Sequence, residues 1–231
     1  MKKNLQAGLI LGMIILSGNS FGQTNGTGKI KGERVTETYL DLVLNVVSTN
    51  LYYGGSNSDL SDYKKSTLGA QVGVAFQAGI TPKFSLASEL YFIMKGGELK
   101  ANNPLTISKS TLRFYTLEFP VMARYQIGKF YVNAGPSIAY TLYGTRKMEG
   151  STKDVSFNNS TEGFKRWDAG IQMGTGYRFK VKQKSVALDV RYNYGLTDIS
   201  HGQEMHNRNL IISLHISNPW KTNPFGKIKK S

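Results

Sequence analysis

The chain has 231 residues, of which 40% are hydrophobic and 19% charged, and its formal net charge is +14. That length allows one good-sized domain or two small ones. With 25 glycines, 6 prolines and no cysteine, the composition excludes collagen-like, low-complexity and disulfide-scaffold classes and thiolate metal sites, and it argues against disorder.

The N-terminus carries an export signature. Lys2 and Lys3 precede an apolar run over residues 7–16, and Ser20-Phe21-Gly22 offers small residues at a cleavage site. This pattern predicts a secretory signal peptide over residues 1–22, because the apolar run is too short to span a membrane as a helix. Residues 23–38 lack periodicity, and we expect them to form a flexible N-terminal arm.

Residues 39–217 repeat one pattern, in which apolar residues recur at every second position. Between Trp167 and Phe179, for example, residues of odd number are mostly bulky and apolar, and residues of even number are polar or glycine. Such alternation predicts a β-strand with one apolar face. We expect eight strands and no helix, with the strands over residues 40–46, 68–77, 84–95, 116–125, 130–140, 167–179, 186–194 and 209–216. Pro120 and Pro136 must then occupy bulges or positions without a ladder N–H.

The connections alternate in length. Long polar segments are expected over residues 49–67, 96–111, 144–166 and 197–208, and short turns over residues 79–83, 127–129 and 181–185. This layout is typical of outer-membrane barrels, which have short periplasmic turns and longer outside loops. An even strand count returns both chain ends, including a basic C-terminal tail over residues 218–231, to the periplasmic side.

The two faces of the strands determine which side meets lipid. An eight-stranded barrel interior is just wide enough for side chains to fill it, so the small and polar face fits inside and the bulky apolar face fits against lipid. Aromatic residues near both strand ends are typical of membrane interfaces. The predicted fold class is all-β, an eight-stranded antiparallel up-and-down transmembrane β-barrel. A β-sandwich and a soluble lipid-binding barrel are the alternatives.

Four stretches resemble a known family. They are Lys83-Phe-Ser-Leu-Ala-Ser-Glu-Leu-Tyr, Leu117-Glu-Phe-Pro-Val, Tyr131-Val-Asn-Ala-Gly-Pro and Leu188-Asp-Val-Arg-Tyr-Asn-Tyr-Gly-Leu-Thr. Together they resemble the PorT-like outer-membrane β-barrel family of Bacteroidetes, which is similar to OmpA/OmpX-type small barrels. The resemblance implies location and architecture over residues 39–217 rather than chemistry. Many such barrels end on an aromatic residue read by the barrel-insertion machinery, an expected partner, whereas this chain ends in Lys229-Lys-Ser.

Charged and polar residues fall on the predicted inner face. Unpaired charges in a narrow barrel are costly, so we expect a salt-bridged network. A proton or ion path is the functional interpretation, and a plugged structural lumen is favoured for eight strands. The predicted lumen polar network comprises Asp41, Glu89, Glu118, Arg124, Asp168, Arg178, Asp189, Arg191 and His215.

Other chemistry-bearing residues lie in the predicted loops. Ser200 and His201 lie near Asp198, but the chain has neither a Gly-x-Ser-x-Gly nor a His-Glu-x-x-His motif, so we expect no catalytic, cofactor-binding or metal site. The scattered basic residues do not suggest a nucleic-acid platform. Cations in the third long segment are candidate contacts for lipopolysaccharide phosphates: Arg146, Lys147, Lys153, Lys165 and Arg166.

The sequence thus predicts a non-enzymatic integral outer-membrane barrel with a plugged lumen and a structural or surface-interaction role. Its termini are expected in the periplasm and its long loops outside the cell, with outer-membrane lipids and lipopolysaccharide as partners. One alternative is an accessory component of a protein-secretion or envelope-assembly system. The other is an outer-membrane lipid-modifying enzyme.

Overall fold

The computed structural model describes residues 39–81, 83–181 and 184–217. The chain divides into two units, Met1–Glu33 and Arg34–Ser231, and every described residue belongs to the second. The predicted signal peptide, N-terminal arm and basic tail lie outside the described residues. Among the described residues, no helix has the length and apolar character needed to cross a membrane.

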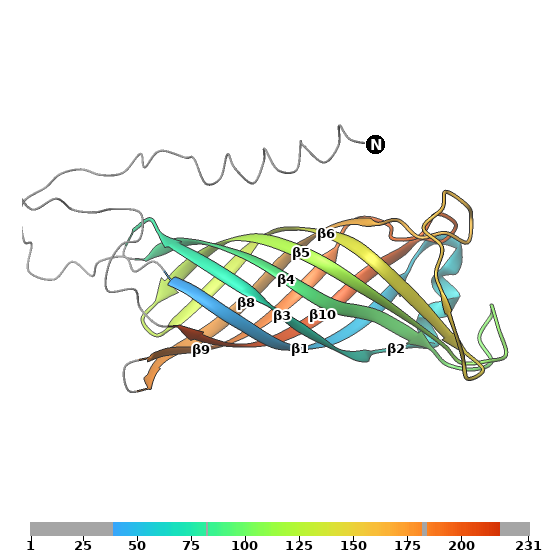
Figure 1. Ribbon diagram of the computed structural model, residues 1–231, viewed down its shortest axis with the longest axis horizontal. Coiled ribbons are helices and arrows are strands. Elements are labelled where there is room, and N and C mark those ends of the chain that lie inside the picture. The colour runs from blue at the N-terminus through green and yellow to red at the C-terminus, as the bar shows by residue number, and fades with distance from the viewer. Residues whose placement is uncertain (1–38, 82, 182–183, 218–231) are drawn as a thin grey trace, which may run out of the picture. The chain divides into compact units, whose positions relative to one another are not determined.

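Eight long strands form the wall of the structure (Figure 1). They are β1 (Tyr39–Tyr53), β3 (Thr67–Gly79), β4 (Phe84–Leu99), β5 (Ser110–Ile127), β6 (Phe130–Met148), β8 (Trp167–Val181), β9 (Lys184–Gly195) and β10 (Met205–Ser217). Three short elements lie among the long connections: the 3-10 helix η1 (Gly55–Asp62), β2 (Lys64–Lys65) and β7 (Ser151–Asp154).

The long strands close into a ring. Each pairs antiparallel with its neighbours along the chain, and β1 pairs with both β3 and β10. Because the first and last strands meet, none of the eight presents an open sheet edge to lipid, as a spanning sheet requires. The prediction of a closed eight-stranded up-and-down barrel is confirmed.

Alternate side chains point to opposite sides of the wall, and at membrane level the apolar ones point outward. On β1, Leu42 and Leu44 are 73% and 67% exposed, whereas the alternating residues Val43 and Asn45 are buried. The same alternation holds around the ring, so the bulky face meets the surroundings and the polar face lines the lumen. The prediction that the polar face lies inside is confirmed, and the soluble lipid-binding alternative with an apolar lumen is wrong.

Both prolines interrupt a ladder without shifting its register. Between β4 and β5 the pairing stops at Ser88↔Val121 and resumes at Tyr91↔Glu118, which leaves Pro120 unpaired on that side. Between β5 and β6 it stops at Pro120↔Ser137 and resumes at Ala123↔Ala134, across the position of Pro136. Each proline therefore lies where a donor is missing from the ladder, as predicted.

One β-bulge lies between β5 and β6. Tyr115 pairs with Tyr143, but Thr116 pairs with Thr141, so Leu142 is an extra residue on β6. Because side chains alternate with a period of two, the extra residue reverses which β6 positions face inward beyond it. Thr141 and Gly144 are accordingly both buried, with exposed Leu142 and Tyr143 between them.

The strands are longer than predicted at the long-loop end, where several segments expected to be loops are strand. These are residues 49–53, 96–99, 110–111, 144–148 and 205–208, and the short β7 pairs with residues 145–148. The expectation of no helix was also wrong, because η1 forms within the first long connection. The strand ends were missed because their outward face is polar, as at Glu98, whereas their inward face carries buried apolar residues such as Leu99 and Leu112.

Candidate functional site in the lumen and at its long-loop mouth

The described lumen contains an ion-paired network around Arg191. The Arg191 guanidinium is fully buried, with its Nη1 2.7 Å from Glu89 Oε2 and its Nε 2.9 Å from Asp189 Oδ1. Asp189 Oδ2 also accepts hydrogen bonds from Tyr131 (2.9 Å) and Asn133 (3.1 Å). Two carboxylates thus share one guanidinium across β4 and β9, and burial without such partners would cost several kcal/mol per charge.

Arg124 and Arg178 extend this network toward the short-turn end. Arg124 lies 4.2 Å over the Tyr131 ring, with its Nη2 4.0 Å from Asp189 Oδ2. Both guanidinium groups donate to Gln77 Oε1, at 2.7 Å from Arg124 and 3.2 Å from Arg178. The arginines are therefore linked through one amide oxygen on β3.

A second network lies closer to the long-loop end and is centred on Lys95. Its ammonium is 3.1 Å from Glu118 Oε2 and 3.1 Å from Asp168 Oδ2. Neutral side chains also donate hydrogen bonds to the two carboxylates. Glu118 accepts from Tyr91, Gln172 and Asn193, and Asp168 accepts from Asn207 and Thr197. Lys95 was not among the predicted lumen residues. It could have been predicted, because it lies an even number of residues from Glu89 and Tyr91 on β4 and therefore points to the same side.

The remaining predicted lumen residues lie near the short-turn end of β1 and β10. His215 is buried, with Nδ1 4.0 Å from the half-buried Asp41 Oδ2. On the same side of the lumen, Asn45, Gln71 and Asn209 have buried amide atoms that find no hydrogen-bond partner among the described residues. This side of the lumen therefore holds amides without described partners beside the His215–Asp41 pair, in contrast to the two ion-paired networks.

The long-loop mouth holds an apolar cluster that the sequence analysis did not anticipate. We call it the loop-end cap. Its buried members come from strand ends, η1 and two long connections: Leu51, Tyr53, Leu60, Leu99, Leu112, Phe114, Phe164, Ile199 and Met205. Tyr63, Val155 and Phe157 pack against them, and the Phe114 and Phe164 rings meet edge to face at 5.1 Å. The alternation of the strand residues could have shown that they point inward. Their contacts with η1 and the long connections could not be predicted from it.

The histidine-containing loop does not assemble a serine–histidine pair. Ser200 is buried and its Oγ accepts from the backbone of Gly202, and the described residues show no hydrogen bond between Ser200 and a histidine. Instead, His206 Nε2 lies 3.3 Å from Asp198 and 3.6 Å from Glu204. Within the described ranges, no group of three or more His, Asp or Glu side chains is arranged to hold a metal ion.

The five candidate lipopolysaccharide-contacting cations do not form one surface. Arg146 and Lys153 are opposite each other in the β6–β7 ladder, and the Arg146 guanidinium lies 5.9 Å from the Phe164 ring. Lys147 points to the other side of β6, into a separate pocket. Arg166 donates to the carbonyls of residues 141 and 142, and Lys165 lines a second pocket with His201 and His206.

Comparison with known structures returns small outer-membrane barrels at low identity. Ail, the attachment invasion locus protein of Yersinia pestis, is 9% identical, with a TM-score of 0.42 over 78% of this chain and 99% of that chain. Neisserial surface protein A (NspA) is 10% identical, with a TM-score of 0.45 over 78% and 97%. OprG from Pseudomonas aeruginosa is 12% identical, with a TM-score of 0.38 over 80% and 95%.

Among curated proteins, no sequence matches the chain. The family model described as "outer membrane protein beta-barrel domain" matches residues 42–201, which is more than half of the sequence and includes most of the closed ring. The chain is an outer-membrane β-barrel protein and belongs to the outer membrane protein beta-barrel domain family.

Proposed function

We propose that this outer-membrane barrel does not conduct, and that its closed lumen supports the long-loop end as a surface for interactions outside the cell. The observation that carries the proposal is the stacking of the loop-end cap over the Lys95 network. An ion that entered from the loop side would have to pass buried Leu51, Phe114 and Phe164 before it reached the Lys95 network. Apolar contacts exclude it there by desolvation.

The charged part of the lumen adds a second barrier. Lys95 and Arg191 each hold two carboxylates at 2.7–3.1 Å, so these charges already have partners and offer little attraction to a passing ion. Their side chains reach between β4, β5, β8 and β9 and occupy the width that an eight-stranded barrel has inside. This arrangement supports a structural lumen over an ion path.

Recordings from planar bilayers test the closed lumen. The folded wild-type protein, verified by a shift in gel mobility between boiled and unboiled samples, is expected to give no conductance steps. The variant Phe114→Ala/Phe164→Ala should also remain closed, because it removes part of the loop-end cap but leaves the Lys95 and Arg191 networks. Uniform conductance steps from folded wild-type protein would overturn the proposal.

We further propose that the long loops lie outside the cell and the chain ends in the periplasm. The long-loop end carries η1, β7 and the longest connections, which is the usual asymmetry of such barrels. The chain has no cysteine, so a Ser151→Cys variant can be labelled alone with a membrane-impermeant maleimide. Labelling of intact cells is expected; labelling only after lysis would contradict this orientation.

Within the family, we propose a place among the PorT-like barrels of Bacteroidetes, on the basis of the four motifs in β4, β5, β6 and β9. We also propose a non-enzymatic role, which is supported by the engagement of Ser200 Oγ with the Gly202 backbone N–H rather than with a histidine among the described hydrogen bonds. No observation in the structure favours a secretion or envelope-assembly role. The proposed partners are the barrel-insertion machinery and outer-membrane lipids, including lipopolysaccharide.

A further inference from the structure

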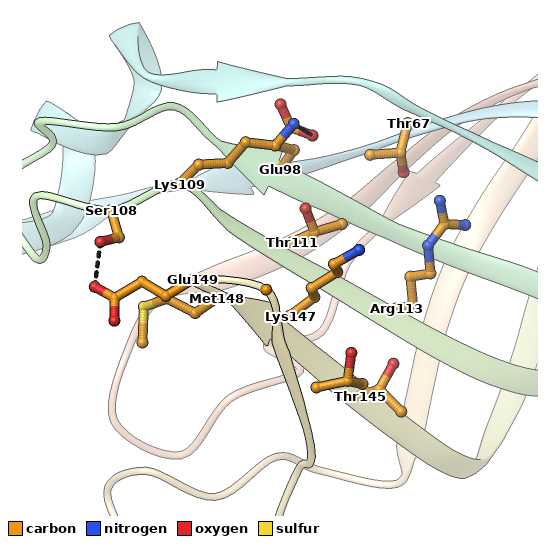
Figure 2. Close-up of a pocket in the computed structure, with 12 residues that line it drawn as sticks. Thr67, Glu98, Ser108, Lys109, Thr111, Arg113, Thr145, Lys147, Met148 and Glu149 are labelled. Carbon is orange, nitrogen blue, oxygen red and sulfur yellow. Dashed lines mark hydrogen bonds and ion pairs between the residues drawn. The ribbon is translucent and has the colours of Figure 1, made fainter.

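An open pocket of ≈ 710 Å³ lies on the outer wall of the barrel near its long-loop end. We call it the outer-wall groove. Figure 2 shows Thr111, Arg113 and Lys147 of β5 and β6 around one open space, with Glu98 and Lys109 at its rim. These side chains belong to the outward set, because Thr111 pairs with Glu98 and Lys147 on either side, while Leu112 between Thr111 and Arg113 is buried.

A glycine on β4 lies opposite Arg113, one of the residues that line the groove. Gly96 pairs with Arg113. It lies between Met94 and Glu98 on the same face of β4 and has no side chain. Its φ is +152°, and an added Cβ would lie 2.1 Å from the carbonyl oxygen of Leu112. The backbone there accepts only glycine without rearrangement, so the close approach of β4 to β5 beside Arg113 depends on Gly96.

The groove has cationic groups without carboxylate partners. Glu98 is occupied by Lys109 at 2.8 Å and by Lys65 at 3.8 Å, and Glu149 accepts a hydrogen bond from Ser108. Among the described residues, neither Arg113 nor Lys147 has a carboxylate within 4.0 Å. In its described hydrogen bonds, Arg113 donates only from Nη1, to the Leu68 carbonyl and to Met94. The other N–H groups of its guanidinium can therefore donate to an oxyanion.

The position of the groove relative to the membrane is given by aromatic residues. Tyr115, the next outward residue of β5 after Arg113, stacks on Tyr143 at 4.2 Å and lies 6.1 Å from Phe92. From Tyr115 to Tyr125 the outward residues of β5 carry no charge. At ~3.4 Å per residue and a tilt of ~40°, this segment rises about 26 Å, close to the apolar band of membrane barrels. Arg113 is thus the first outward charge above that band.

We infer that the outer-wall groove binds the phosphorylated sugar headgroup of an outer-leaflet glycolipid, the lipid A part of lipopolysaccharide. Arg113 and Lys147 would hold a phosphate, and the hydroxyls of Thr111 and Thr145 would contact sugar oxygens. The acyl chains would extend down the wall past Tyr115 and Tyr143. This site differs from the loop cations predicted from sequence and shares only Lys147 with them. It rests on the proposed orientation, with the long-loop end at the outer leaflet.

Native mass spectrometry of the protein in detergent tests this assignment. Wild-type protein is expected to retain one lipid A at concentrations where dephosphorylated lipid A and inorganic phosphate do not bind. The variant Arg113→Gln/Lys147→Gln should weaken lipid A binding roughly tenfold, the loss expected for two partly exposed charge-assisted contacts. The matched control Arg146→Gln/Lys153→Gln removes the same charge from the opposite face of the β6–β7 ladder and should change binding less than about twofold.

Several results would overturn the inference. Equal losses in both double variants would show attraction by net charge alone. Equal affinity for lipid A and its dephosphorylated form would remove the role of the phosphate, and full competition by inorganic phosphate would assign the site to the free anion. Because lipid affinity is measured in detergent, it is independent of the Ser151→Cys labelling, so a wrong orientation and a wrong site give different results.

Discussion

Two sections of the same barrel wall have opposite polarity. Along β5, the section from Tyr115 to Tyr125 is apolar outside and carries buried Glu118 and Arg124 inside; the section above it has Arg113 outside and buried Phe114 inside. The backbone ladder continues through both. Strand geometry therefore sets only the alternation of side chains, and the surroundings of the wall decide which set is apolar.

The two sections are also stabilised differently. The membrane-level section holds its interior by ion pairs, which stabilise only when both partners are present. The upper section holds its interior by the loop-end cap, whose contribution scales with buried apolar area. Substitutions should accordingly have different consequences in the two sections, and the expected effects below run from the largest to the smallest.

The largest effect is expected at Arg191. Replacement by leucine leaves Glu89 and Asp189 buried without their guanidinium partner, and breaking such a pair costs about 3–5 kcal/mol. Urea unfolding in detergent micelles, followed by gel mobility, measures this loss. The triple variant Arg191→Leu/Glu89→Gln/Asp189→Asn removes the stranded charges and should recover much of the stability. A single variant as stable as wild type would contradict the importance of the network.

A smaller effect is expected from a charge placed on the outer wall. Ile212 is the third of five outward residues on β10, which run from Arg208 to Ile216. A lysine at the level of the bilayer midplane costs about 2–4 kcal/mol, so Ile212→Lys should destabilise the protein in lipid vesicles by that amount. Ser151→Lys on exposed β7 is the control and should change stability by less than about 0.5 kcal/mol. Equal effects at the two positions would show that Ile212 does not face lipid.

The smallest effect is expected at two turn glycines, one at each end of the barrel. Gly128 (φ +63°) and Gly150 (φ +78°) have no atom within 4 Å of an added Cβ. Alanine at either position should therefore lower the free energy of unfolding by only about 1 kcal/mol, the strain of a left-handed backbone conformation in a residue with a side chain. Thermal unfolding of both variants checks this. A much larger loss at Gly128 alone would indicate that the short turn has a further role in assembly.

The sequence allowed the closed ring and the inner and outer faces of its strands to be predicted, because two-residue alternation is local and continuous in strands such as β8. The upper strand ends could not be recognised by the same rule, since polar residues such as Glu98 and Arg113 point outward there. The loop-end cap depends on contacts between distant segments, such as Phe114 with Phe164, that no local pattern encodes. The outer-wall groove was missed for the same reason, because it joins β4, β5 and β6 above the bulge.

The extra residue Leu142 acts as a phase shift between the two sections of β6. Below it, odd-numbered residues face the lumen; above it, even-numbered residues do, so Arg146 faces inward and Lys147 faces the groove. Deleting this one residue would exchange the faces of the whole upper segment without altering the chemistry of any side chain. The length of the chain at this point, rather than the identity of any cation, decides which charges this end of the barrel wall presents to its surroundings.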